Sequence, residues 1–266
     1  MIRARKQFGQ HFLEPAWVAK VIAAIAPHAD ETFIEIGPGT GALTRPLAAQ
    51  ARAVTAFEID RDLAAQLQAT APPNVRVIEG DFLTRDPSDF RLQTSDVVRV
   101  AGNLPYNVAS PILFKLVALH AAGLKLADAT VMLQREVADR LVAGPGSREY
   151  GVLSILIGHS ASVQTILKLP AGAFRPPPKV LSALVRLQFH PPDPPAKDEA
   201  AFAAMVQAVF TRRRKTLANA LLAFPPAVAT TPARMLRDAG IDGARRPETL
   251  SIPEFVRLAD TVVPPR

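Results

Sequence analysis

From Thr32 onward, short apolar strands alternate with helix-like segments in this 266-residue chain, and this pattern restricts the possible folds more than any other. The segments follow one another in the order TFIEI, LTRPLAAQA, VTAFEI, DLAAQLQAT, VRVIEGD and VVRVAGN. Such alternation is typical of βαβ units, in which successive strands lie parallel. We therefore predict an α/β fold built on a Rossmann-like, doubly wound sheet that is mostly parallel.

Later segments extend this sheet and then change character. ATVMLQ predicts another strand, REVADRLVA a helix, and ASVQTILKL and VLSALVRLQF two adjacent late strands, added antiparallel. The proline-rich stretch HPPDPPAK, starting at His190, interrupts any regular element. We therefore predict one domain over residues 1–190 and a second over 191–266. The segments AAFAAMVQAVF, RKTLANALLA, PARMLRDAG and IPEFVRLADTV predict that the second domain is a small all-helical cap.

Composition narrows the class of protein. Cysteine is absent, which excludes disulfides, thiolate metal sites and cysteine nucleophiles. We find neither an apolar run long enough to span a membrane nor the hydrophobic block of a signal peptide, so we expect a soluble, cytoplasmic protein. The formal net charge of +7 favours a polyanionic partner, either nucleic acid or an anionic membrane.

A glycine-rich turn follows the first strand of the alternation, in TFIEIGPGTGALT. Gly37, Gly39 and Gly41 allow the backbone to approach a nucleotide-like cofactor at the N-terminus of the next helix. The G-x-G-x-G spacing differs from the G-x-G-x-x-G of dinucleotide folds, which argues against a Rossmann oxidoreductase. A tight structural turn is the alternative interpretation of these glycines.

Two acidic residues at the ends of the next strands support a cofactor site. Glu58 lies about 20 residues after the glycines, where a carboxylate accepts hydrogen bonds from both ribose hydroxyls. Asp81, in EGDFL, is placed to accept from the amino group of an adenine. Taken alone, Asp81 is equally consistent with a helix cap or a turn residue.

The fourth strand ends in AGNLPYNVASPI, where a turn is formed by Asn103, Leu104, Pro105 and Tyr106. The exocyclic nitrogen of adenine is a poor nucleophile because its lone pair is delocalised into the ring, so an enzyme must hold and polarise the amino group. The side-chain oxygen of Asn103 and the backbone carbonyl of Leu104 supply two acceptors. Pro105 cannot donate a competing hydrogen bond.

Tyr106 offers a flat face for stacking a target base that has left its own stack. An ordinary core aromatic is the alternative. Methyl transfer from a sulfonium is an in-line displacement, so proximity and orientation are the chief requirements, and neither a metal nor a dedicated base is needed.

These and further motifs resemble a known family over nearly the whole chain. The resemblance is carried by FGQHFL, EIGPGTGALT, FEIDRDL, EGDFL, GNLPYNVASPI, LQREVADRLVAGPGSREYGVLS, AFRPPPKVLSALVRL, RRRKTLANAL and GIDGARRPETLSIPEF. Together they closely resemble the bacterial small-subunit ribosomal RNA adenine dimethyltransferases. The resemblance implies a class I methyltransferase sheet and S-adenosylmethionine as cofactor. It also implies N6-dimethylation of two adjacent adenosines in the 3′-terminal hairpin loop of 16S rRNA, late in small-subunit assembly.

The same resemblance assigns site residues. Cofactor contacts fall on His11, Leu13, Gly37, Glu58, Asp81 and Asn103. His11 replaces an asparagine of some relatives, so its contact is either through the backbone or through the ring, and a surface residue is the alternative. Phe174, in AFRPPPKV, lies where related enzymes place a second aromatic against the target base, although a lone phenylalanine is more often a core residue.

Basic residues suggest how RNA binds. The run Arg212, Arg213, Arg214 and Lys215 is expected to open a helix in the second domain, and with Arg3, Arg5, Lys6 and Arg175 it would frame a phosphate-binding groove. A solvated face is the alternative. We expect the partner to be 16S rRNA in the small subunit or its precursor, with no membrane contact, and the protein to be a monomer.

Proteins with two other functions are built on the same fold. The first is that of the large-subunit rRNA adenine methyltransferases of macrolide resistance, but the NLPY, PPPKV and RRKTLANAL stretches favour the small-subunit family. The second is that of a non-catalytic RNA-binding or transcription factor. Glu58, Asp81 and the N-L-P-Y turn argue against a loss of catalysis, and the lack of a transit segment argues against import into mitochondria.

Overall fold

The computed structural model describes residues 11–90, 96–225 and 230–263. The chain divides into two compact units. The sheet unit comprises Met1–Ala138 and Val163–Phe189, and the helical unit comprises Asp139–Ser162 and His190–Arg266. The sequence-based boundary at residue 190 leaves segment 139–162 in the first domain, whereas its contacts group it with the C-terminal residues.

The sheet unit is built on a seven-stranded sheet in the order β4-β3-β2-β5-β6-β9-β7 within the described residues. Its strands are β2 (Thr32–Ile36), β3 (Ala53–Glu58), β4 (Val75–Glu79), β5 (Val98–Asn103), β6 (Leu126–Gln134), β7 (Ala161–Leu169) and β9 (Ser182–Phe189). The first five pair in parallel, and β9 pairs with β6 antiparallel. The predicted α/β sheet with antiparallel late strands is therefore confirmed.

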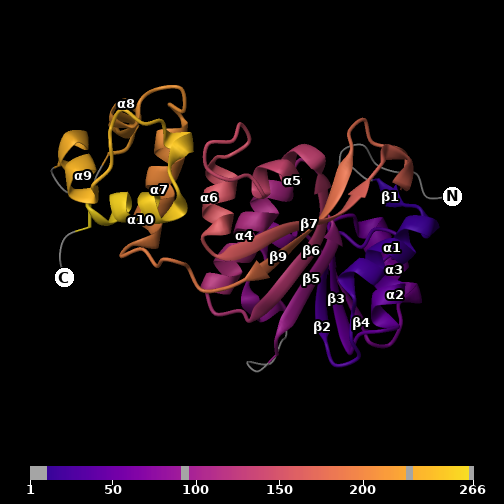
Figure 1. Cartoon of the computed structure of the whole chain (residues 1–266). Helices are drawn as coiled ribbons and strands as arrows, with labels where there is room; N and C mark the ends of the chain where they lie inside the picture. The colour runs from indigo at the N-terminus through magenta and orange to yellow at the C-terminus, as the bar shows by residue number, and fades with distance from the viewer. Residues whose placement is uncertain (1–10, 91–95, 226–229, 264–266) are drawn as a thin grey trace. The chain divides into compact units, whose positions relative to one another are not determined.

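Helices cover both faces of this sheet, with α1 (Pro15–Ile25), α2 (Thr44–Ala48) and α3 (Arg61–Thr70) on one side and α4 (Ala109–Ala121) on the other (Figure 1). Short 3-10 helices η2 (Phe82–Thr84), η3 (Pro87–Phe90) and η4 (Ala171–Ala173) complete the connections. Every residue of β2 is buried, as a strand covered on both faces requires. Asp60 caps α3 by accepting from the amide of Asp62 at 3.0 Å.

A two-stranded ribbon joins the N-terminal segment to the sequence before β9. It consists of β1 (Phe12–Leu13) and β8 (Phe174–Arg175), paired antiparallel, with Leu13 opposite Phe174. Both of these side chains are buried in the core of the sheet unit. The ribbon therefore fixes His11, which precedes β1, close to the loop that comes after β8.

The helical unit contains α6 (Val152–Gly158), α7 (Glu199–Phe210), α8 (Leu217–Ala220), η5 (Leu221–Ala223), α9 (Pro232–Ala239), η6 (Pro247–Thr249) and α10 (Ile252–Asp260), while α5 (Arg135–Leu141) precedes α6. Its own core joins Tyr150 and Ile155 to apolar residues of α7–α10. Asp198, Thr231 and Ser251 cap α7, α9 and α10. No described helix is both long and apolar enough to cross a membrane.

One predicted helix of this unit is much shorter than expected. RKTLANALLA was predicted to be helical throughout, but α8 covers only Leu217–Ala220 and is followed by a 3-10 turn. The helix begins late because Thr216 has extended backbone dihedrals, with ψ at 155°. The basic run therefore lies in the turn between α7 and α8 and opens no helix.

Candidate active site

The carboxyl ends of the parallel strands bring the predicted cofactor residues to one edge of the sheet. Ile36, the last residue of β2, lies opposite Phe57 on β3 and Gly102 on β5. Gly37, Glu58 and Asn103 therefore meet at this edge, where open α/β sheets form their ligand crevices. All three line a pocket that, with its open mouth, encloses about 740 Å³.

The glycine turn forms one wall of this pocket. Gly37 and Gly39 have φ values of +70° and +57°, a region that side chains other than glycine rarely adopt. A Cβ atom on Gly39 would lie 3.2 Å from the ring of Phe12, another pocket residue. Gly41 also has a positive φ, of +82°, but it does not line the pocket. The first two glycines therefore shape the site, and the third shapes the turn.

Glu58 is a buried residue of the pocket lining and is held by backbone amides. Its Oε2 accepts from Gly39 N at 2.8 Å, and its Oε1 accepts from Asp60 N at 2.9 Å. Burial raises the pKa of Glu58, while these amide hydrogen bonds oppose the rise. These two hydrogen bonds therefore hold the Glu58 carboxylate in position before any ligand binds. Its oxygens keep further lone pairs that could accept hydrogen bonds from ribose hydroxyls.

A second buried carboxyl, Glu35, was missed by the sequence analysis. It lies on β2, lines the pocket, and is only 1% exposed. Its Oε2 has no hydrogen-bond partner among the described atoms. Burial raises the pKa of Glu35 to about 7; Thr44 lowers it and the nearby Glu58 raises it further. The one acidic residue in the apolar strand TFIEI is the signal that could have found it.

The turn after β5 is anchored to the segment before β1. Asn103 Nδ2 donates to the backbone carbonyl of His11 at 2.7 Å. Because this bond uses the amide nitrogen, the Oδ1 of Asn103 remains as an acceptor for a substrate amine. Leu104 is buried and donates its backbone N–H to Met132 O at 3.2 Å, and Pro105 lines the pocket beside it.

Tyr106 forms the neighbouring wall of the pocket, and two contacts hold its ring. Its hydroxyl lies 2.6 Å from Ser182 Oγ, on the first residue of β9. The imidazole of His11 stacks against it, with ring centroids 5.6 Å apart and an interplanar angle of 26°. Burial raises the pKa of Tyr106, and the hydrogen bond with Ser182 lowers it. Tyr106 is therefore a half-buried pocket residue, not a core aromatic.

His11 contacts both functional groups of this turn. Its carbonyl accepts from Asn103 while its ring stacks on Tyr106. Its Nδ1 lies 2.7 Å from Pro176 O and must be the donor, because a carbonyl oxygen only accepts. His11 and Leu13 both line the pocket.

Besides Gly41, two residues predicted for the site, Asp81 and Phe174, lie outside the pocket lining. Asp81 Oδ1 accepts from Leu83 N at 2.9 Å and so caps η2. Phe174 is 1% exposed and packs in the core of the sheet unit. Asp81 is thus a cap residue and Phe174 a core residue of the sheet unit, and their contacts with the cofactor and the target base stay predictions.

The basic residues divide into distinct groups. Arg3, Arg5 and Lys6 lie outside the described residues. Arg175 is 80% exposed, although its Nε lies 2.6 Å from Glu14 Oε1. Arg212, Arg214 and Lys215 are exposed in the turn after α7.

Arg213 differs from its neighbours. Its Nη2 donates to Arg148 O at 2.7 Å and to Ser147 O at 3.3 Å, and its Nε lies 4.0 Å from Glu248 Oε2. This guanidinium braces a loop of the helical unit, so the exposed cations of the run are Arg212, Arg214 and Lys215. No group of acidic, histidine or cysteine side chains within the described ranges could hold a metal ion.

Comparison with known proteins identifies the family of this chain. A sequence model of the family described as "Ribosomal RNA adenine dimethylase" matches residues 1–261. The chain belongs to this dimethylase family.

Its relatives in the dimethylase family include enzymes named ribosomal RNA small subunit methyltransferase A. The protein from Acinetobacter baylyi is 44% identical over 98% of this chain and 93% of its own length. The one from Salmonella typhimurium is 40% identical over 97% of this chain and 92% of its own length. This member of the family is thus a methyltransferase.

Solved structures of similar proteins support the same fold. A dimethyladenosine transferase from Plasmodium falciparum has a TM-score of 0.74 at 24% identity, covering 93% of this chain and 96% of its own. The 23S rRNA methyltransferase ErmE has a TM-score of 0.67 at 27% identity, covering 94% and 99%. Identity is therefore higher to relatives named for the small subunit than to this enzyme named for the large one.

Proposed function

We propose that this protein uses S-adenosylmethionine to dimethylate N6 of two adjacent adenosines in the 3′-terminal hairpin loop of 16S rRNA, late in small-subunit biogenesis. The observation that carries the proposal is the arrangement of Asn103. Asn103 Nδ2 donates to the backbone carbonyl of His11, so Asn103 Oδ1 remains as an acceptor in the pocket that Gly37 and Gly39 line. The identity to relatives named for the small subunit supports the choice of RNA.

The pocket residues fit S-adenosylmethionine as the methyl donor. Glu58 is placed for the two ribose hydroxyls, and the positive φ values of Gly37 and Gly39 permit close approach of a ligand to the backbone. The unpartnered, buried Oε2 of Glu35 fits the ammonium group of the methionine moiety. When bound, S-adenosylmethionine supplies an electrophilic methyl group on a sulfonium.

The turn after β5 activates the target nitrogen by holding it. Asn103 Oδ1 and the carbonyl of Leu104 accept hydrogen bonds from the N6 amino group and orient its lone pair toward the methyl carbon. With S-adenosylmethionine bound, each transfer would form an N–C bond as the S–C bond breaks, and N6 would lose one proton to solvent. Tyr106 stacks on the adenine and keeps it in line.

RNA binding rests on exposed cations. We assign phosphate contacts to Arg175, Arg212, Arg214 and Lys215, together with Arg3, Arg5 and Lys6 of the N-terminal segment. Arg213 supports its loop instead. We also propose that the protein acts as a monomer in the cytoplasm. Its substrate is the small subunit or its precursor, and it makes no membrane contact.

Asn103→Ala tests the role of the acceptor. Loss of one preorganised polar contact to the reacting group is expected to lower methyl transfer to under-methylated small subunits by at least about 100-fold. Asn107→Ala is the matched control, since Asn107 is an exposed amide of the same segment. Circular dichroism checks that both variants fold. Retained turnover in Asn103→Ala would show that another group orients N6.

A further inference from the structure

Two consecutive large apolar residues are exposed in the loop between β8 and β9. Val180 is 43% exposed and Leu181 is 45% exposed. A single exposed aliphatic residue is ordinary, but here two follow one another in the sequence, and neither belongs to a core cluster of the described residues. We call this loop, residues 176–181, the rim loop.

Both ends of the rim loop are attached to the wall of the pocket that contains Tyr106. At its start, Pro176 O accepts from His11 Nδ1 at 2.7 Å, and the His11 ring stacks on Tyr106. Directly after its end, Ser182 Oγ lies 2.6 Å from the Tyr106 hydroxyl. The backbone is also fixed, because Leu181 O accepts from Arg135 N at 2.9 Å. The apolar pair is therefore held at the edge of the target-base site.

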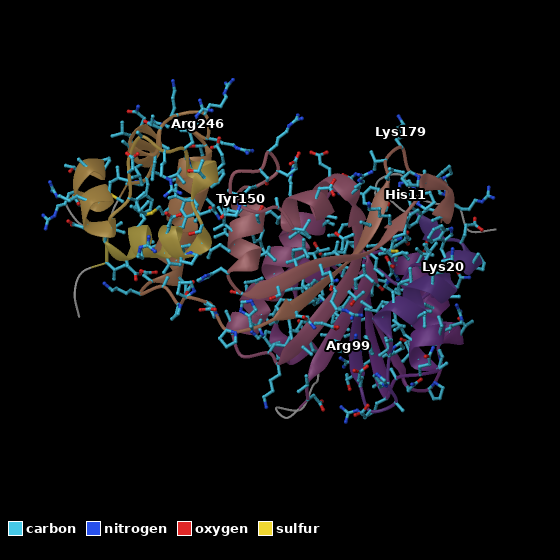
Figure 2. The ribbon with its side chains drawn as sticks, in the orientation of Figure 1. His11, Lys20, Arg99, Tyr150, Lys179 and Arg246 are labelled. Carbon is cyan, nitrogen blue, oxygen red and sulfur yellow. The ribbon has the colours of Figure 1, made fainter. Side chains whose placement is uncertain are left out.

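Exposed cations accompany the apolar pair. Lys179 directly precedes Val180 and projects outward from the loop, above His11 in Figure 2. Arg175 lies just before the loop and is 80% exposed. Phosphates attract such cations, while apolar side chains favour the faces of bases. In a nucleic acid strand, each nucleotide carries both a phosphate and a base.

We propose that Val180 and Leu181 form a wedge that packs against the bases flanking the target adenosine and keeps that adenosine out of its stack. This inference rests on the proposed function, and its occupant is the unpaired strand of an RNA hairpin loop. An adenosine that enters the pocket exposes the faces of its neighbours, and an apolar wedge covers those faces without reading their sequence. Lys179 and Arg175 hold the adjoining phosphates.

The test compares two double variants that each replace one exposed valine and one exposed leucine. Val180→Ser with Leu181→Ser changes the wedge, whereas Val142→Ser with Leu222→Ser changes residues of the helical unit that are 45% and 62% exposed. Each is assayed for methyl transfer to under-methylated small subunits and for S-adenosylmethionine binding by calorimetry. We expect kcat/KM of the wedge variant to fall about tenfold or more, because its packing against bases is removed, with cofactor affinity unchanged. The control variant should match wild type.

A second substrate separates a wedge from a merely structural loop. In small subunits reconstituted with rRNA that keeps one target adenosine and lacks the base on each side of it, the wedge has no flanking base to contact, so wild type and wedge variant should have equal kcat/KM. Val180→Ile with Leu181→Met retains apolar surface and should retain wild-type activity. Equal activity of wedge variant and control on intact rRNA would overturn the wedge, as would an undiminished difference on abasic rRNA. Absence of methyl transfer by wild type itself would instead overturn the proposed function.

Discussion

Glu35 is the residue whose chemistry depends most on its position in the fold. A carboxyl group in the centre of an apolar strand loses its hydration, which disfavours the charged form. Burial accordingly raises the pKa of Glu35 to about 7, and one of its oxygens is left without a partner among the described atoms. A cationic ligand group in the pocket would relieve both penalties.

Stability should therefore depend on the protonation of Glu35. Because its folded pKa is raised, the protonated carboxyl is favoured by the fold, and stability is full below the ordinary value of 4.5 and falls as pH rises to about 7. The loss is at most about 3 kcal/mol of unfolding free energy. Glu35→Gln should remove this pH dependence, which denaturant unfolding at pH 5 and pH 8 would measure. An unchanged pH dependence in the variant would contradict the role of Glu35.

Cofactor binding supplies the complementary measurement. If ionised Glu35 binds the ammonium group, affinity for S-adenosylmethionine should rise from pH 5.5 to 7.5, and Glu35→Gln should bind more weakly with a flatter profile. Calorimetric titration measures both. Equal affinity of the two proteins throughout this range would remove Glu35 from the cofactor site.

At the scale of elements, the turn after α7 and the start of α10 stabilise the helical unit. Arg213 joins the α7–α8 turn to the carbonyls of Ser147 and Arg148. The start of α10 is fixed by a capping box, in which Ser251 N donates to Glu254 Oε2 at 2.8 Å and Ser251 Oγ accepts from the Glu254 amide at 3.4 Å. These contacts hold segments that carry exposed cations.

Arg213 and its neighbours should respond differently to substitution. Replacing Arg212, Arg214 and Lys215 by alanine should weaken rRNA binding and reduce the dependence of log affinity on log salt by about 0.7 for each phosphate that is no longer neutralised. Arg213→Ala should leave the salt dependence unchanged and instead lower the unfolding free energy by about 1 to 2 kcal/mol, because the hydrogen bonds that brace its loop are removed. Filter binding over a salt series and thermal unfolding measure the two effects. A reduced salt slope in Arg213→Ala would reassign this residue to the RNA surface.

The capping box of α10 predicts a loss of stability in acid. Arg245 donates to Glu254 and, with Ser251, lowers the pKa of Glu254 to about 2. A lowered folded pKa stabilises the protein above the ordinary value of 4.5, and this contribution is lost as pH falls from 4.5 toward 2. Glu254→Gln should cost about 1 kcal/mol at pH 7 and less at pH 3. Urea unfolding at both values tests this, and an equal cost at both would show that ionisation is irrelevant.

For the molecule as a whole, the sequence predicts the strands, the helices and the site residues that follow strand ends, because short stretches of sequence determine these. Gly37, Glu58 and Asn103 were placed at one site because parallel strands end at a common edge. The role of Arg213 was missed because it depends on contacts far apart in sequence. Glu35 was missed although its acidic side chain stands out in an apolar strand, because its chemistry comes from its burial in the folded sheet. Segment 139–162 was assigned to the first domain for the same reason: the pattern around it shows helices and strands but not the core in which they pack.

The choice of RNA and of target base can be measured by methyl transfer from labelled S-adenosylmethionine to small ribosomal subunits that lack the modification. Large-subunit RNA is assayed in parallel, and the modified bases are mapped. We predict dimethyladenosine at two adjacent positions of the 3′-terminal hairpin loop in small-subunit rRNA and none in large-subunit RNA. Modification of large-subunit RNA alone, or no transfer despite cofactor binding, would contradict this account.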